Sequence, residues 1–176
     1  MNSKGILSIS EVNALPPEQF EWLFGNVVEH FPEAARNVLI NRPFASVKLL
    51  KKCFEDYLEK LDASDKENIL IRHPDLAGKL AEEGSLTTES QLEQKSAGLE
   101  TMTKEEKQML TNYNDLYKEK FNFPFVICAR ENKVQAILTS IKVRLQNTRD
   151  QELSTGIQEV KKICNIRIDD IVWSDV

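Results

Sequence analysis

The chain has 176 residues, of which 41% are hydrophobic and 29% charged, and its formal net charge is −5. This length suits one domain with a buried core, and the composition is typical of a soluble globular protein. The acidic balance argues against nucleic acid or an anionic membrane as a partner, because both are bound through a basic face. No apolar run approaches the roughly 18 residues that a membrane-spanning helix needs.

The three cysteines, Cys53, Cys128 and Cys164, are far apart, and each has apolar neighbours. This pattern predicts buried thiols in a reducing intracellular compartment rather than disulfides or a metal site. The sequence has no histidine pair for zinc, no Gly-rich phosphate loop and no nucleophile elbow. We therefore expect no metal, and any catalysis would be acid–base and electrostatic.

Apolar residues recur at helical spacing along most of the chain, which predicts an all-α fold. We expect a single domain over residues 1–176 with about eight helices. Two capping-box patterns mark helix starts, Ser64 with Glu67 and Thr103 with Glu106, and Gly84 and Gly98 mark left-handed helix ends. The predicted helices around the candidate site cover residues 64–72, 75–83, 88 or 90 to 97, 103–120, 133–149 and 154–168.

The run from Phe121 to Ala129 is apolar, is divided by Pro124 and is too short for a helix. Because no second strand is evident, we predict a buried extended segment. Its backbone amides and carbonyls need partners, and they could bond a planar, urea-like ligand. Plain core packing is the alternative.

His73 precedes Pro74 and Asp75 at the predicted end of a helix. Proline disfavours helical geometry at the residue before it and stiffens the backbone there. Since histidine titrates near neutrality, His73 is a candidate acid–base group. The alternative is a loop histidine bonded to a nearby carboxylate, with Asp75 capping the next helix.

Glu93 has two interpretations. Ser90 and Glu93 have the spacing of a capping box, in which Glu93 would bond the backbone amide of Ser90. If Thr88 caps the helix instead, Ser90 and Gln94 lie one turn apart with Glu93 beside them. That second arrangement presents a hydroxyl, a carboxylate and an amide together. The sequence leaves both open.

On the last predicted helix, the apolar row Val160, Ile163 and Cys164 continues onto Arg167. An arginine on an apolar face needs an anion or must reach solvent, and a bound carboxylate would satisfy it in bidentate fashion. The alternative is a cation stabilised by the dipole at a helix C-terminus.

Three blocks of sequence stand out together. They are His73-Pro74-Asp75-Leu76-Ala77-Gly78, Ser90-x-x-Glu93-Gln94-x-x-Ala97-Gly98-Leu99 and Tyr117-x-x-Lys120-Phe121-x-Phe123-Pro124-Phe125-Val126-Ile127-Cys128. In order and spacing they resemble the 2-oxo-4-hydroxy-4-carboxy-5-ureidoimidazoline (OHCU) decarboxylase family. The resemblance runs from about Ile9 to Trp173, and Arg167 fits it late in the chain.

The resemblance implies decarboxylation of a small-molecule substrate, OHCU, to (S)-allantoin and CO2 in urate degradation, without a cofactor. It also implies an all-helical homodimer in which His73 is the catalytic acid–base residue and Glu93 its essential partner. The residues implied to line the substrate pocket are Pro74, Ser90, Gln91, Leu92, Glu93, Gln94, Phe125, Val126, Ile127, Cys128 and Ala129, with Arg167 as an anchor for an anionic group.

The pathway implies a peroxisomal location. The final residues, Ser174-Asp175-Val176, are not a peroxisomal signal, because an acidic residue stands where that signal has a base, so the cytosol is the alternative. A rival function is a non-catalytic helical module that binds a partner helix in a groove. It explains the amphipathic helices equally well, but not the presence of His73, Glu93 and Arg167 near apolar runs.

Overall fold

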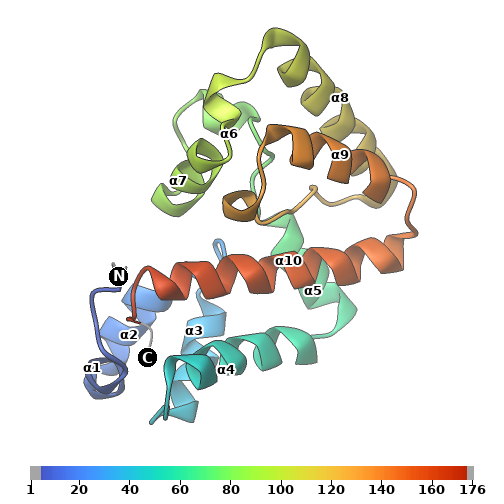
Figure 1. Cartoon of the computed structure of the whole chain (residues 1–176). Helices are drawn as coiled ribbons and strands as arrows, with labels where there is room; N and C mark the ends of the chain where they lie inside the picture. Colours follow the sequence, from blue (N-terminus) through green and yellow to red (C-terminus); the bar gives the residue numbers. More distant parts are fainter. Residues whose placement is uncertain (1–4, 174–176) are drawn as a thin grey trace. The chain divides into compact units, whose positions relative to one another are not determined.

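The computed structural model describes residues 5–173, which form helices joined by short loops (Figure 1). The α-helices are α1 (Ile9–Ala14), α2 (Pro17–Phe24), α3 (Glu33–Val38), α4 (Val47–Lys60), α5 (Ala63–Ile71), α6 (Lys79–Glu82), α7 (Thr88–Ser96), α8 (Lys104–Phe121), α9 (Val134–Arg144) and α10 (Arg149–Asp169). The 3-10 helices are η1 (Leu39–Asn41), η2 (Leu99–Thr101) and η3 (Ala129–Glu131).

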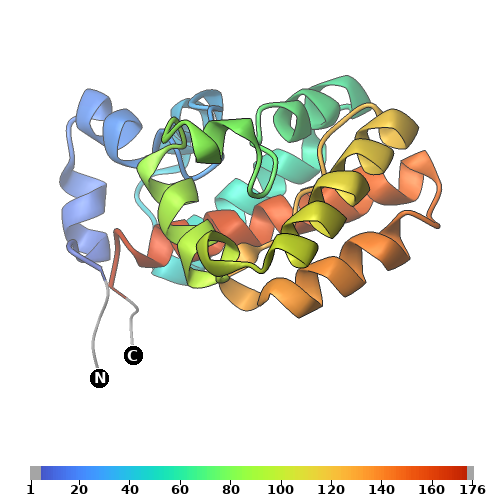
Figure 2. The same ribbon diagram turned by 90° about the horizontal axis from the view of Figure 1, so that it is seen from above.

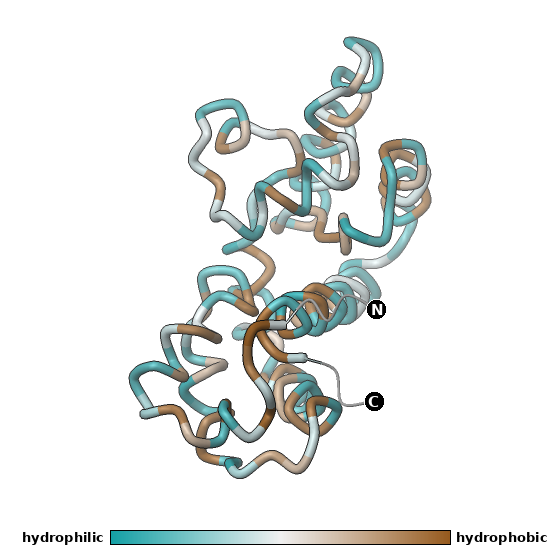
Figure 3. The backbone as a smooth tube through the Cα atoms, turned by 60° about the vertical axis from the view of Figure 1, so that its left-hand side comes forward, coloured by the Kyte–Doolittle hydropathy of each residue, from teal (hydrophilic) through white to brown (hydrophobic). Residues whose placement is uncertain are grey.

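The all-α prediction is confirmed: residues 5–173 contain no strand, and an isolated bridge pairs Leu7 with Val172. The described part of the chain has ten α-helices rather than about eight, since several, such as α6, are only about one turn long. Hydrophobic and hydrophilic residues alternate along the longer helices (Figure 3). Within the same residues, no helix has the length and apolar character needed to cross a membrane.

The chain divides into two compact units. Unit 1 comprises the described parts of Met1–Ile69 and Lys161–Val176, and unit 2 comprises Leu70–Val160. The expected single domain over residues 1–176 stays a prediction. In unit 1, α3 packs against α4, whose first turn is capped by Ser46. The rings of Phe24 and Phe54, 6.3 Å apart, lie in its core.

Unit 2 contains all three blocks that define the resemblance. Its longest complete helix, α8, begins with the predicted capping box of Thr103 and Glu106 and ends at Asn122, which has a φ of 62°. Helix α8 packs against α9, and the two lie side by side in Figure 2. Helix α7 packs against η3, which follows the buried segment at Phe123–Cys128. The predicted buried, non-helical segment is therefore confirmed over residues 123–128, whereas at its predicted ends Phe121 belongs to α8 and Ala129 to η3.

Helix α6 begins later than expected. The sequence predicted a helix from Asp75, but α6 begins at Lys79, and Ala77 has a left-handed φ of 50°. The carboxylate of Asp75 binds Lys118 instead of capping a helix. Residues 73–78 therefore form a loop, which we call the His73 loop. The predicted left-handed end at Gly84 is confirmed, with a φ of 70°.

Two other helix starts also differ from the prediction. Helix α5 begins at Ala63, where Asp62 Oδ1 accepts the Asp65 amide at 2.8 Å, so the expected capping box of Ser64 and Glu67 is wrong. Helix α10 begins at Arg149 rather than near Ser154. Its start is a capping box that the sequence analysis missed, in which Thr148 and Gln151 each accept the backbone amide of the other.

Gly156 marks a close approach inside unit 2. A Cβ atom built at Gly156 on α10 would lie 2.9 Å from both methyl carbons of Leu70. Leu70 is fully buried at the end of α5. The absence of a side chain at residue 156 therefore allows the side chain of Leu70 to pack directly against the backbone of α10.

Candidate functional site

The N-terminus of α7 decides between the two interpretations of Glu93. Thr87 is the N-cap, and its hydroxyl accepts the backbone amide of Ser90 at 3.2 Å. The capping box with Ser90 as its first residue is therefore wrong, and so is Thr88 as the cap. Ser90, Glu93 and Gln94 lie one turn apart on a single face of α7, each no more than 9% exposed. This is the arrangement that presents a hydroxyl, a carboxylate and an amide together.

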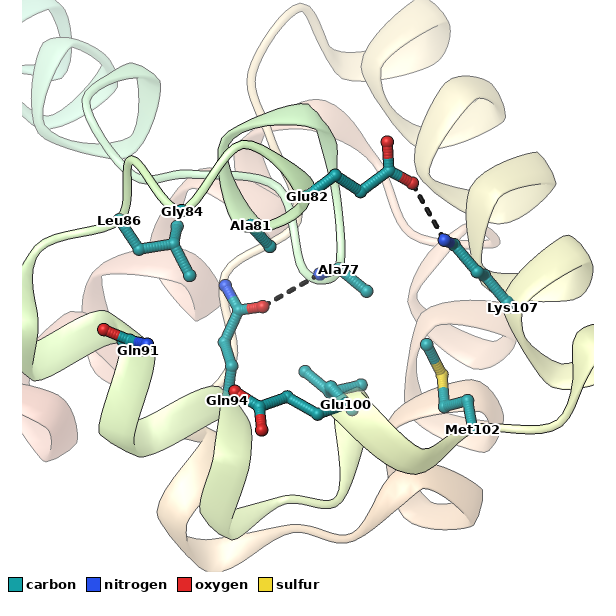
Figure 4. Close-up of a pocket in the computed structure, with 11 residues that line it drawn as sticks. Ala77, Ala81, Glu82, Gly84, Leu86, Gln91, Gln94, Glu100, Met102 and Lys107 are labelled. Carbon is teal, nitrogen blue, oxygen red and sulfur yellow. Dashed lines mark hydrogen bonds and ion pairs between the residues drawn. The ribbon is translucent and has the colours of Figure 1, made fainter.

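Gln94 joins this face of α7 to the His73 loop (Figure 4). Its Oε1 atom accepts the backbone amide of Ala77 at 2.9 Å, and its Nε2 atom donates to the carbonyl of Asp75 at 3.4 Å. Both backbone groups belong to a loop with no regular structure of its own. The side chain of Gln94 therefore supplies partners that a helix would have supplied internally.

Helix α8 holds the same loop from two successive turns. Asn114, which is buried, donates from Nδ2 to the carbonyl of Leu76 at 3.1 Å. One turn later, Lys118 Nζ lies 2.5 Å from Asp75 Oδ2. The loop that follows His73 is thus fixed by side chains from α7 and α8 together.

His73 itself is 9% exposed, and its backbone amide donates to the carbonyl of Leu70 at 3.1 Å. It lines a cavity of about 400 Å³ together with Asp75, Lys118 and Pro124. A histidine at a cavity, on a backbone held by proline and by loop contacts, has the geometry expected of an acid–base group.

A second cavity of unit 2, of about 350 Å³, lies between α6, α7, η2 and the start of α8 (Figure 4). Gln91 and Gln94 line it from α7, and an ion pair of Glu82 with Lys107, 2.9 Å long, lies at its edge. Leu92 is 62% exposed, on the face of α7 opposite to Ser90 and Gln94. Of the expected residues on α7, Gln91 and Leu92 are exposed, whereas Ser90, Glu93 and Gln94 are buried.

Residues Phe125 to Ala129 are buried, and protein side chains bind several of their backbone groups. The carbonyl of Val126 accepts Arg144 Nη1 at 2.8 Å. The amide of Cys128 donates to Glu159 Oε1 at 3.3 Å, and the carbonyl of Cys128 accepts Asn132 Nδ2 at 2.9 Å. An irregular segment can remain buried because its polar groups are satisfied in this way.

Cys128 connects this segment electrostatically to Glu93. Burial raises the pKa of the Cys128 thiol to about 11, and the negative charges of Glu131, Glu159 and Glu93 contribute to the shift. The Glu93 carboxylate therefore lies near enough to Cys128 to act on its charge. All three cysteines are thiols, with Cys128 and Cys164 buried and Cys53 half-buried.

Arg167 belongs to unit 1, where it meets a carboxylate of the protein. Its Nη1 atom donates to the carbonyl of Asn26 at 2.8 Å and lies 3.5 Å from Glu29 Oε1. Arg167 is 3% exposed and Glu29 is fully buried, so the guanidinium does not simply reach solvent at a helix end. The predicted role of Arg167 as an anchor for an anionic group of the substrate stays a prediction.

Unit 2 contains every other expected site residue. Pro74 is half-buried beside His73 in the loop, and α7 and the segment at Phe125–Ala129 carry the rest. Within residues 5–173, no three His, Cys, Asp or Glu side chains gather closely enough to hold a metal ion.

Several polar residues around this site, all of them buried except the half-exposed Lys118, were missed by the sequence analysis. They are Asn114, Lys118, Arg144, Glu152 and Glu159. For Arg144 a signal was present, because it continues the apolar row of Ile137 and Ile141 on α9, as Arg167 continues the row on α10. Asn114 gave the same kind of signal, because it stands between Leu110 and Tyr117 in the apolar row of α8, whereas Lys118 gave none.

Comparison with known families gives a match over most of the chain: the model of the OHCU decarboxylase family matches residues 13–169. The chain belongs to the OHCU decarboxylase family. The OHCU decarboxylase of Xenopus laevis is 44% identical over 96% of this chain and 97% of its own length. The predicted family resemblance is confirmed.

Two solved structures are similar to the chain. The crystal structure of OHCU decarboxylase in the presence of (S)-allantoin is 25% identical, with a TM-score of 0.64 over 77% of this chain and 87% of that chain. The crystal structure of an (S)-allantoin synthase matches with a TM-score of 0.76 over 94% of this chain and 54% of that chain. Since that second match is 19% identical, it shows a shared fold.

Proposed function

We propose that this chain converts OHCU to (S)-allantoin and CO2 in urate degradation, with His73 as the acid–base residue and Glu93 as its partner. The observation that carries the proposal is the contact of Gln94 with the His73 loop. It joins the buried face of α7, with Ser90 and Glu93, to the loop that positions His73. Family membership supplies the substrate and the reaction.

The reaction suits a site with these groups. The carboxylate of OHCU is attached to a ring carbon that also bears a hydroxyl and adjoins a C=N bond. That bond accepts the electron pair as CO2 leaves, so the substrate supplies its own electron sink. His73 contacts the hydroxyl and fixes the carboxylate perpendicular to the ring. Apolar surroundings favour loss of the charged carboxylate as neutral CO2.

The remaining polar groups bind the ureido side and the ring. Glu93 accepts N–H groups, and Gln94 can both donate and accept. In the Phe125–Ala129 segment, the backbone amide and carbonyl of Ile127 make no hydrogen bond with any group among residues 5–173, although Ile127 is 6% exposed. Buried backbone groups of this kind need a partner, and a urea-like ligand offers a matching N–H and C=O.

We also propose a homodimer, as the family resemblance implies, and a peroxisomal location with the cytosol as the alternative. Light scattering of the purified chain tests the homodimer. We expect a mass twice the 20.2 kDa of one chain, and a mass of 20.2 kDa would contradict the dimer. Imaging of the full-length chain with a tag at its N-terminus tests the peroxisomal location. The C-terminal residues 174–176 that bear on this lie outside the described residues.

Circular dichroism during turnover tests the proposed reaction. OHCU is generated in place from urate by uricase and hydroxyisourate hydrolase, and the signal of one allantoin enantiomer is followed. Without a catalyst, allantoin forms slowly and as a racemate, so a fast one-handed signal reports rate and stereochemistry together. If the folded protein gives no acceleration, the decarboxylase proposal is wrong, and the helical interaction module becomes the better account.

A further inference from the structure

We infer that a buried ion pair of Arg144 and Glu152 is a positioning device that fixes the substrate-binding backbone at Phe125–Ala129. The inference rests on the proposed function, because that segment is where the substrate's ureido side would bind. Neither residue belongs to the acid–base machinery. Their side chains are 8% and 0% exposed, and Arg144 Nε lies 2.8 Å from Glu152 Oε1.

The carboxylate of Glu152 is fully enclosed by donors. Besides Arg144, its Oε1 atom accepts the hydroxyl of Tyr117 at 2.5 Å, and its Oε2 atom accepts Asn147 Nδ2 at 2.9 Å. Burial, followed by the hydrogen bond to Glu152, raises the pKa of Tyr117 well above its usual value, so this hydroxyl remains a donor. A buried charge with three donors is held in one geometry, since any displacement leaves it unsatisfied.

Arg144 transmits this fixed geometry to the segment through two separate contacts. Its Nη1 atom donates to the carbonyl of Val126 at 2.8 Å. Its guanidinium carbon lies 4.3 Å from the centre of the Phe125 ring, close enough for a cation–π contact. Tyr117 meets the same Phe125 ring edge-on, with centroids 5.4 Å apart. One residue after Val126 comes Ile127, to whose backbone groups we assign the ligand's ureido side, so a shift at Val126 moves them directly.

The pair could instead serve stability alone, and the two roles make different predictions. Replacing Arg144 alone leaves the Glu152 carboxylate buried without its cation, which destabilises any fold. Removing both charges relieves that penalty, and such replacements of buried pairs are often neutral for stability. The contacts of Arg144 with the Val126 carbonyl and the Phe125 ring are lost in the single variant and in the double variant. Stability and substrate binding should therefore separate in the double variant.

The experiment compares wild type, Arg144→Met and the double variant Arg144→Met with Glu152→Gln. The measurements are the melting temperature, KM and kcat for OHCU, and hydrogen exchange of peptides covering residues 125–129. We expect Arg144→Met to lower the melting temperature and raise KM about tenfold, with a smaller change in kcat. The double variant should recover most of the melting temperature while KM stays raised and exchange stays fast. Leu110→Ala, a core change on α8, controls for destabilisation and should leave KM near the wild-type value.

Recovery of KM together with the melting temperature in the double variant would overturn the inference, because the pair would then act on stability alone. Slow exchange of residues 125–129 in the double variant would also overturn it, whatever the activity. If wild type fails to accelerate OHCU decarboxylation, the proposed function is wrong, and the exchange measurement still decides whether the pair fixes this segment.

Discussion

The Oε1 atom of Gln94 accepts the backbone amide of Ala77 at 2.9 Å, so α7 and the His73 loop are joined by a side chain that is itself 5% exposed. Gln94→Leu removes this bond and the weaker one to Asp75. Leaving the Ala77 amide unsatisfied should cost about 1–3 kcal/mol of unfolding free energy. Urea denaturation measures this, and kcat for OHCU should fall as well because the loop loosens.

Gln91→Leu is the matched control for that variant. Gln91 lies on the same helix and lines the neighbouring cavity, but it is exposed. We expect an unfolding free energy within about 0.5 kcal/mol of wild type. Equal losses in the two variants would mean that the contact with Ala77 contributes nothing specific.

His73→Asn should lower kcat/KM for OHCU by at least about 100-fold, because the loss of a general acid–base group typically costs this much. The dichroic assay of allantoin formation measures it. His30→Asn makes the same chemical change at the other histidine, which is exposed in unit 1, and should leave the rate near wild type. A His73→Asn variant that keeps most of the wild-type rate would show that another group carries the proton.

Thr87→Ala should destabilise the protein by about 1 kcal/mol, because its hydroxyl caps α7 by accepting the Ser90 amide. Thr88→Ala should change stability little, since Thr88 is exposed in the first turn and makes no cap. Thermal unfolding of the two variants side by side tests this assignment. A larger loss for Thr88→Ala would contradict it.

Because the thiol of Cys128 is buried, we expect the unfolding free energy of the protein to fall in alkali. Burial raises its pKa from 9.0 to about 11, so the folded state keeps the proton while the unfolded thiol releases it. The unfolded state then binds fewer protons, and the unfolding free energy falls as the pH rises from 9 towards 11. A shift of this size corresponds to about 2–3 kcal/mol.

The variant Cys128→Ala isolates that contribution from other alkaline effects, such as titration of Tyr117. Urea denaturation between pH 8 and 11 should show a shallower loss in the variant than in wild type. Parallel curves for the two proteins would contradict a buried, protonated thiol at residue 128.

Local signals predicted the elements whose determinants are close in sequence. The capping box of Thr103 and Glu106 and the left-handed end at Gly98 are examples, because each involves residues within one turn. Residues 75–78 of the His73 loop were predicted to be helical, and they are not. The partners of this loop are Gln94 and Lys118, which lie 17 or more residues away and leave no periodic trace in the sequence.

The candidate site divides in the same way. His73 and Glu93 could be found from residue type and spacing, and the resemblance gave them roles. The cap at Thr87, which decides how the α7 face is presented, is neither of the two caps that the sequence left open, Thr88 and Ser90. The pairing of Arg144 with Glu152 could not be inferred from the apolar row that marks Arg144, because the sequence does not show which partners a buried charge has.

Gly156 couples two positions that are far apart in the chain. Alanine is the better helix former by about 1 kcal/mol, so replacing a mid-helix glycine is a common route to a more heat-resistant protein. Here the added methyl would lie 2.9 Å from Leu70, which is fully buried. We therefore expect Gly156→Ala to stabilise the protein only when Leu70 is replaced by a smaller residue at the same time. Among related chains, we therefore expect a larger residue at position 156 to be accompanied by a smaller one at position 70.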